Sequence, residues 1–217
     1  MRYRLLVLDH DDTIVDSTAT IHYPAFTQAM KVLRPEVKMT LEEYFLMNND
    51  PGIVNYYEQV VHLQKEEKKI EFAIWQEYIA SKVPSAFPYI KELMVRFKKE
   101  GGYIAVISTN RKETILRDFA HNDLPLPDAI YGSELPKEQQ KPSPYPLLDA
   151  LSQFHVDPQE ALVVDDLGLG HAMARSCGVP SFYSLWVHEL SSLRDKAKEA
   201  GIPYGDNVSD LAHYLFD

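Results

Sequence analysis

Four aspartates follow a short apolar run near the start of the chain: Asp9, Asp11, Asp12 and Asp16, in the stretch "LLVLDHDDTIVDS". Carboxylates this close repel one another, and each resists ionising beside its neighbours. Such a cluster is costly unless a cation, a set of backbone N–H groups or a reaction uses the charge. The pattern therefore indicates a site where one of these three uses of the charge applies.

Other polar groups also come directly after apolar runs or open a loop: Ser108-Thr109-Asn110 after "YIAVI", Lys141 at the start of "KPSPYP", and Asp165-Asp166 after "ALVV". A single carboxylate after a strand is an ordinary helix cap. Two acidic clusters, a pair of hydroxyls and a lysine together are harder to explain in that way. They indicate one site if the fold brings these strand ends together.

Short apolar runs of strand type recur along the chain at 4–9, 103–108, 128–132, 161–166 and 181–186. Continuous apolar runs suit strands that are covered on both faces, as in a parallel sheet. Helical patterns at 88–99, 112–120, 145–154 and 170–177 separate several of them. This alternation predicts an α/β fold with a doubly wound parallel sheet. Open sheets of this kind bind ligands at the carboxyl ends of their strands.

Residues 17–87 break the alternation. They show helical patterns at 17–34, 40–47, 53–63 and 66–81 and no convincing strand. We therefore expect a helical domain over 17–87, inserted into an α/β core formed by 1–16 and 88–217.

Composition narrows the class of protein. The chain has 217 residues, a net charge of -10 and 45% hydrophobic residues, which is ordinary for a globular protein. The negative charge argues against a general nucleic-acid binder. The single cysteine, Cys177, excludes an internal disulfide and a cysteine-based zinc site. No apolar stretch reaches the length of a membrane span or of a signal peptide, so a cytoplasmic location without membrane contact is expected.

In order and spacing, these groups resemble the haloacid dehalogenase superfamily of phosphohydrolases over nearly the whole chain. The first motif of that family is Asp-x-Asp-x-Thr after an apolar strand, the second a Ser or Thr that ends the next core strand, the third a Lys often followed by Pro, and the fourth an acidic pair or Gly-Asp. The matching residues are Asp9, Asp11 and Thr13, then Ser108, then Lys141-Pro142, then Asp165-Asp166.

Two positions depart from the common pattern. Asp12 stands where members commonly carry Gly, but Asp tolerates unusual backbone angles, so the turn is expected to be kept. Gly170 stands where many members have a further Asp in the fourth motif. This form resembles the sugar-phosphate mutase and related branches, which use an adjacent acidic pair.

The resemblance implies that Asp9 attacks phosphorus to give an aspartyl phosphate and that Asp11 is the general acid and base. It implies Mg²⁺ held by Asp9, by the main-chain carbonyl of Asp11 and by Asp166 or Asp165. Counting back from Gly178 favours Asp166 as the direct ligand. Hard oxygen ligands suit magnesium and not zinc.

The phosphate group is expected to be held by a set of polar and cationic residues: Thr13, Ser108, Thr109, Asn110 and Lys141. The choice between Ser108 and Thr109 as the hydroxyl of the second motif stays open. His10, between the two motif aspartates, is expected to lie near the site. By resemblance, the helical insert is a cap domain that contacts the rest of a small phosphorylated metabolite.

The leading prediction is a magnesium-dependent phosphatase of small phosphomonoesters. A phosphomutase of the β-phosphoglucomutase kind is the alternative, supported by the Asp165-Asp166 pair. A phosphoaspartate receiver module uses similar groups but is much shorter and has no helical insert, so it is disfavoured. The sequence leaves the substrate and the oligomeric state open.

Overall fold

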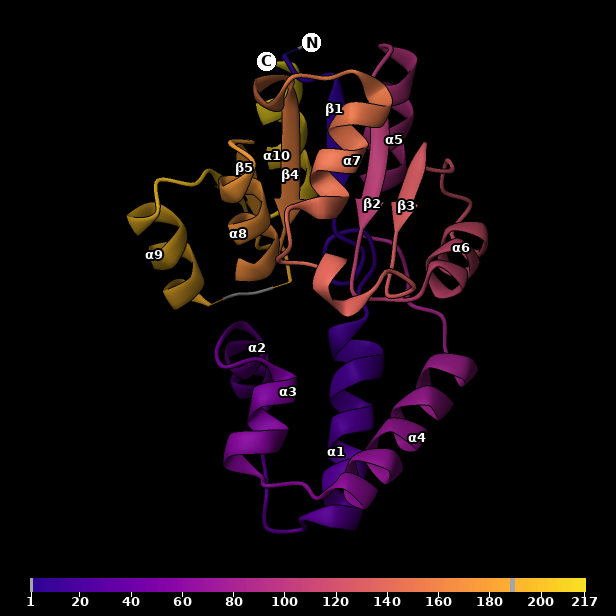
Figure 1. Cartoon of the computed structure of the whole chain (residues 1–217), viewed down its shortest axis with the longest axis vertical. Coiled ribbons are helices and arrows are strands. Elements are labelled where there is room, and N and C mark those ends of the chain that lie inside the picture. The colour runs from indigo at the N-terminus through magenta and orange to yellow at the C-terminus, as the bar shows by residue number, and fades with distance from the viewer. Residues whose placement is uncertain (1, 188–189) are drawn as a thin grey trace. The chain divides into compact units, whose positions relative to one another are not determined.

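The computed structural model describes residues 2–187 and 190–217 (Figure 1). Its chain divides into two compact units, one formed by Met1–Asp16 with Ser85–Asp217 and the other by Ser17–Pro84. In the part that is described, no helix is both long enough and apolar enough to cross a membrane.

A six-stranded parallel sheet forms the centre of the larger unit, in the order β3-β2-β1-β4-β5-β6 (Figure 1). The strands are β1 (Leu5–Leu8), β2 (Tyr103–Ile107), β3 (Ala129–Tyr131), β4 (Ala161–Asp165), β5 (Ser181–Ser184) and β6 (Tyr204–Gly205). The strand order reverses direction between β1 and β4, which makes this pair the topological switch point of the sheet. The predicted α/β fold with a doubly wound sheet is confirmed.

Both faces of the sheet are covered, as the continuous apolar runs predict. Leu6 and Leu8 of β1 pack in one core cluster with residues of α5 (Ile90–Lys99), α6 (Lys112–His121) and α10 (Val208–Phe216). Leu5 and Val7 point to the other face, where α7 (Tyr145–Phe154) and α8 (Gly168–Ser176) pack. The period of two along β1 thus divides the core into two layers.

The smaller unit contains the helical insert: α1 (Tyr23–Leu33), α2 (Leu41–Asn49), α3 (Ile53–Asn55) and α4 (Lys65–Ser81). Its core is rich in aromatic side chains, with Phe26, Tyr44 and Tyr57 buried together. The Arg34 guanidinium donates to both carboxylate oxygens of Glu67, at 2.7 and 2.9 Å, which links the end of α1 to the start of α4.

The helices of this unit are less regular than their sequence patterns predict. Thr18–His22 and Tyr56–Val60 form π-helical turns, so the patterns at 17–34 and 53–63 are each divided. In the larger unit, β6, α9 (Ser191–Glu199) and α10 were not predicted from the sequence. A two-residue strand such as β6 is too short to show a periodic pattern.

Candidate active site

Three buried carboxylates meet at the switch point of the sheet. Asp9 directly follows β1, Asp165 ends β4, and Asp166 follows it. Leu8 pairs with Val164 in the parallel register, and Asp9 N donates to Val164 O at 2.9 Å, so the acidic ends of the two strands lie side by side. One carboxylate oxygen from each of the three aspartates lies within 4.8 Å of the others.

Lys141 links two of these carboxylates from the loop between β3 and α7. Its Nζ donates to Asp9 Oδ1 at 2.5 Å and to Asp165 Oδ2 at 2.7 Å, and its side chain is only 5% exposed. Burial lowers the pKa of Lys141, but the two carboxylates outweigh it and the net shift is upward, so the lysine stays charged. An ammonium has three N–H donors. Two are used by these carboxylates, which leaves one for another acceptor.

The buried carboxylates of this group repel one another. Burial raises the pKa of Asp9 well above its usual value, and the neighbouring carboxylates add to this shift although Lys141 opposes it. Burial, together with Asp12 and Asp165, raises the pKa of Asp166 in the same way. A divalent cation among these oxygens would offset that repulsion. The donor set is all carboxylate, which fits a hard cation of the magnesium or calcium type.

The turn after β1 has a defined backbone. Asp12 adopts a left-handed conformation with φ of 57°, which Asp tolerates better than most residues, so the turn is kept without glycine. The His10 carbonyl accepts from Ile14 N at 2.9 Å and from Val15 N at 3.2 Å, which closes the turn. Thr13 is fully buried, and its hydroxyl shares a hydrogen bond of 2.7 Å with that of Ser184 at the end of β5.

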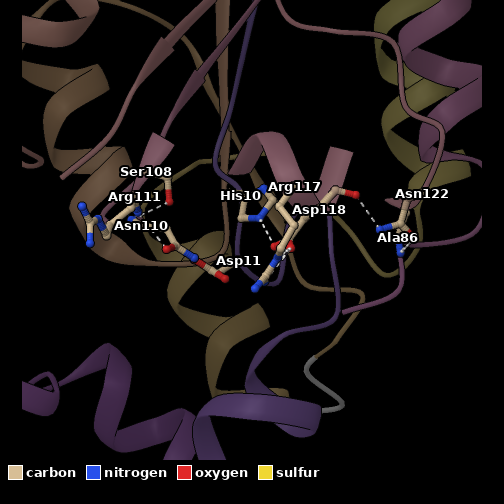
Figure 2. A network of polar contacts seen from close by, with 9 residues as sticks. All are labelled: His10, Asp11, Ala86, Ser108, Asn110, Arg111, Arg117, Asp118 and Asn122. Atoms are coloured by element: carbon tan, nitrogen blue, oxygen red, sulfur yellow. Dashed lines mark hydrogen bonds and ion pairs between the residues drawn. The ribbon is translucent and has the colours of Figure 1, made fainter. Parts of the chain in front are cut away.

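The residues after β2 connect to the second aspartate of the turn. Ser108 is buried, and its Oγ accepts from Asn110 N at 3.1 Å (Figure 2). Asn110 is also buried, and its Nδ2 donates to Asp11 Oδ2 at 3.3 Å. Thr109 is exposed. Of the two hydroxyls, that of Ser108 is therefore part of the network that reaches Asp11.

The carboxylate of Asp165 is held on several sides. Its Oδ1 accepts from Leu167 N at 2.9 Å, while Oδ2 accepts from Lys141. His171 Nε2 donates to the main-chain oxygen of Asp165 at 3.1 Å, and the His171 ring packs on Tyr183 with ring centroids 3.5 Å apart. Burial lowers the pKa of His171 to about 4, so the imidazole is neutral near neutral pH.

His10 does not face solvent. Its ring is fully buried, and Nε2 donates to Asp118 Oδ2 of α6 at 3.0 Å (Figure 2). Three residues of this region were not predicted from the sequence: Asp118, Ser184 and His171. For Asp118 a signal exists, because it lies on the buried face of α6 with Ile115 and Phe119, where helical spacing predicts an apolar residue.

Comparison with known proteins agrees with this fold and this site. The haloacid dehalogenase-like hydrolase family matches residues 6–183. The chain therefore belongs to the haloacid dehalogenase-like hydrolases. The buried group of Asp9, Asp165 and Asp166 fits the metal site of that family.

Among similar proteins, the phosphoglycolate phosphatase of Aquifex aeolicus is 25% identical over 195 residues, which cover 84% of this chain and 85% of the relative. A protein assigned as the pyrophosphatase PpaX of Caldanaerobacter subterraneus is 36% identical over 98 residues, 45% of this chain and 44% of that relative, so less than half of its length is matched. The structure of a haloacid dehalogenase-like protein of Agrobacterium tumefaciens matches with a TM-score of 0.74 at 18% identity, covering 98% of this chain and 97% of the other. By its family, the chain is an enzyme of the haloacid dehalogenase-like hydrolase type.

Proposed function

We propose that this enzyme is a magnesium-dependent phosphatase of small phosphomonoesters that works through an aspartyl phosphate on Asp9. One observation carries the proposal: the Asp9 carboxylate is held by Lys141 inside a buried acidic group at the switch point of the sheet. A carboxylate fixed in this way is oriented for attack, and the cationic groups around it can offset the charge of a phosphate.

In the first step, an Asp9 carboxylate oxygen forms a bond to phosphorus and the bond from phosphorus to the substrate oxygen breaks. Asp11 gives its proton to that leaving oxygen. In the second step, the Asp11 carboxylate takes a proton from water, whose oxygen bonds to the same phosphorus while the bond from phosphorus to the Asp9 oxygen breaks. Inorganic phosphate leaves, and Asp9 is free for another cycle. Splitting the displacement in two is the usual advantage of a covalent intermediate.

The contact between Asn110 and Asp11 supports this division of work. A side-chain amide that donates to Asp11 Oδ2 helps to hold the carboxyl group in one orientation. We therefore propose two roles for Asn110: it orients the Asp11 carboxyl group, and it contacts phosphate oxygens.

Asp9, Asp166 and the main-chain carbonyl of Asp11 are the proposed ligands of Mg²⁺. Bound there, the ion would neutralise part of the charge that builds up on the transferring phosphoryl group. Asp166 is a better ligand than Asp165 because both Asp165 oxygens already accept hydrogen bonds, from Leu167 N and from Lys141. Asp165 then serves to hold Lys141 in place.

Phosphate oxygens would be bound by the third N–H of Lys141, by the hydroxyl of Ser108 and by backbone N–H groups of the turn. The Ser108 oxygen already accepts from Asn110 N, so its own proton is available to donate. Thr13 contributes by fixing the turn, since its hydroxyl bonds to that of Ser184. Exposed Thr109 is a further candidate contact.

Residues 17–87 are proposed to be the cap domain, which contacts the non-phosphate part of the substrate and excludes water during the first step. Phosphoglycolate is the first substrate to test, given the similarity to the phosphatase of Aquifex aeolicus. A phosphomutase is the second candidate, favoured by the adjacent pair Asp165-Asp166 with glycine at position 170.

A screen of phosphorylated metabolites with magnesium present tests the proposal, with phosphoglycolate, pyrophosphate, sugar phosphates and nucleotides in the panel. Release of inorganic phosphate from at least one phosphomonoester, lost in Asp9→Asn, is the expected result. A phosphomutase would instead convert one sugar phosphate to its isomer faster than it releases phosphate. No turnover of any substrate with magnesium present would contradict both.

A further inference from the structure

The turn that carries Asp9 and Asp11 is attached to α6 by one buried side chain. His10 lies between the two aspartates and is fully buried, and its Nε2 donates to Asp118 Oδ2 at 3.0 Å (Figure 2). The His10 ring also stacks on Phe119, the next residue of α6, with ring centroids 6.1 Å apart. A hydrogen bond and a ring contact to successive residues fix both the direction and the depth of the His10 side chain.

Asp118 is itself held in one orientation. Its Oδ1 accepts from Arg117 Nε at 2.9 Å and from Arg117 Nη2 at 2.7 Å, which leaves Oδ2 directed at His10. The carboxylate is almost fully buried, at 1% exposure for the whole residue. Burying a carboxylate is costly unless its oxygens accept hydrogen bonds. Asp118 Oδ2 therefore requires a hydrogen-bond donor, which His10 Nε2 provides.

The same helix face holds the segment where the chain re-enters the larger unit. Asn122 lies one turn after Asp118, and its Nδ2 donates to Asp118 O at 2.8 Å (Figure 2). Asn122 Oδ1 accepts from Ala86 N at 2.8 Å. Ala86 also bridges to Val15 of the turn. One face of α6 is therefore a common anchor for the turn and for the returning chain.

We propose that His10 and Asp118 are positioning residues for phosphoryl transfer: their buried hydrogen bond fixes the backbone of the turn against α6 and so sets where the Asp9 and Asp11 carboxylates stand. Neither side chain touches the substrate. The kinetic consequence of this inference rests on the proposed phosphatase function. The structural consequence is independent of that function.

The kinetic consequence is a loss in kcat with little change in KM. The two side chains proposed to bind the phosphate, Lys141 and Ser108, come from other segments and do not depend on His10, so most of the binding is kept although the turn also contributes backbone N–H groups. A displacement of the two carboxylates by about 1 Å is enough to reduce turnover by about a hundredfold. The structural consequence is faster exchange of the Ile14 and Val15 amides, because both donate to the His10 carbonyl.

Three variants test the proposal. His10→Leu removes the donor and keeps a buried apolar group, whereas His10→Gln places an amide N–H near the position of Nε2. Asp123→Asn is the matched control, since Asp123 is an exposed acid just beyond α6 that pairs with Lys91. Steady-state kinetics and hydrogen exchange of the Ile14 and Val15 amides are measured for each.

His10→Leu is expected to lower kcat about a hundredfold with KM nearly unchanged and to speed exchange at both amides. His10→Gln should restore most of the kcat and most of the protection of the two amides from exchange, and Asp123→Asn should resemble the wild type. Unchanged kcat in His10→Leu, or a His10→Gln variant as impaired as His10→Leu, overturns the proposal. If His10→Leu does not fold, Asp118→Ala decides: it removes the oxygen that accepts from His10 Nε2 and leaves the His10 ring in place, and a wild-type kcat in it would refute positioning.

Failure of the proposed function is distinguishable from failure of this inference. A wild-type protein that turns over no phosphomonoester refutes the phosphatase. The exchange rates of the Ile14 and Val15 amides still decide whether His10 holds the turn.

Discussion

Gly170 leaves free the space that the Asp165 carboxylate occupies. A Cβ built at Gly170 would lie 2.0 Å from Asp165 Oδ2, far inside van der Waals contact. In the family pattern that this chain resembles, many members have Gly before the metal-binding aspartate and a further Asp at the position of Gly170. The geometry explains why the two forms are alternatives, because carboxylates from both positions would compete for the same place beside Lys141.

Replacement of Gly170 should therefore be far more damaging than replacement of Gly168, two residues earlier in α8. Gly170→Ala forces Asp165 to move, and overpacking of this kind costs about 1–3 kcal/mol. A Cβ at Gly168 meets no atom within 4 Å, so Gly168→Ala is the matched control. Chemical denaturation and kcat measured for both variants check this. Equal effects in the two variants would show that the space is not limiting.

The double change Asp165→Gly with Gly170→Asp should recover part of the activity that Gly170→Asp alone loses. It removes the clash and returns a carboxylate to the neighbourhood of Lys141. Phosphate release compared across the two single variants and the double variant measures the coupling. A double variant that is no better than Gly170→Asp would contradict the interchange of the two positions.

Asp11 and Asp166 should fail in different ways. Asp11→Asn removes proton transfer and should lower turnover by about 10²–10⁴-fold for substrates with poor leaving groups, but less for an activated aryl phosphate. Asp166→Asn should weaken magnesium binding and depress both substrates alike. The comparison is made at saturating magnesium. If Asp11→Asn lowers both substrates equally and shifts the magnesium requirement, the acid–base role is wrong.

Metal removal should silence the enzyme, and magnesium should restore it. Calcium should not, because its larger and looser coordination misplaces the nucleophile relative to the phosphate. Magnesium should also raise the Tm of the wild type, since a ligand that binds only the folded state stabilises it. The Tm of Asp166→Asn should respond much less. Full activity in excess chelator would exclude the metal from the mechanism.

Glu71 of α4 should make the stability of the protein depend on pH. Burial raises the pKa of Glu71, although the hydrogen bond from Tyr57 opposes this shift. A carboxyl whose pKa is raised in the fold stabilises the fold below its unfolded pKa, and that contribution is lost as the pH rises through the folded value. Glu71→Gln keeps an acceptor for Tyr57, so it should increase the free energy of unfolding at neutral pH relative to the wild type.

At acidic pH, where the carboxyl is protonated, the difference between Glu71→Gln and the wild type should shrink. Exposed Glu77 on the same helix provides the control, and Glu77→Gln should show no such trend. Urea denaturation at neutral and at acidic pH measures the free energies. A difference that grows toward acidic pH would contradict the sign.

The sheet could be predicted because its strands are covered on both faces. Such strands appear in the sequence as continuous apolar runs, as in Leu5–Leu8 and Ala161–Asp165. The acidic site could be predicted because its residues directly follow those runs. The contact between His10 and Asp118 could not, since it joins residues 108 positions apart and depends on which face α6 presents to the turn. The hydrogen bond between Thr13 and Ser184 could not be predicted either. These residues are also far apart in the sequence, and a hydroxyl at a strand end has many possible partners.

The roles of Asp165 and Asp166 could be predicted only in part from the sequence. The pair Asp165-Asp166 was visible in the sequence, and counting back from Gly178 favoured Asp166 as the metal ligand. The contacts of Asp165 with Leu167 N and Lys141, by contrast, depend on the fold and could not be predicted from the sequence.

Asp9 is expected to become phosphorylated during turnover. Rapid acid quench of the wild-type enzyme with substrate and magnesium, followed by mass spectrometry of its peptides, measures this directly. We expect one added phosphoryl group on the peptide that contains Asp9, lost after treatment with hydroxylamine and absent from a folded Asp9→Asn variant that no longer turns over. A phosphorylated peptide elsewhere in the chain, or an Asp9→Asn variant that still releases phosphate at the wild-type rate, would contradict it.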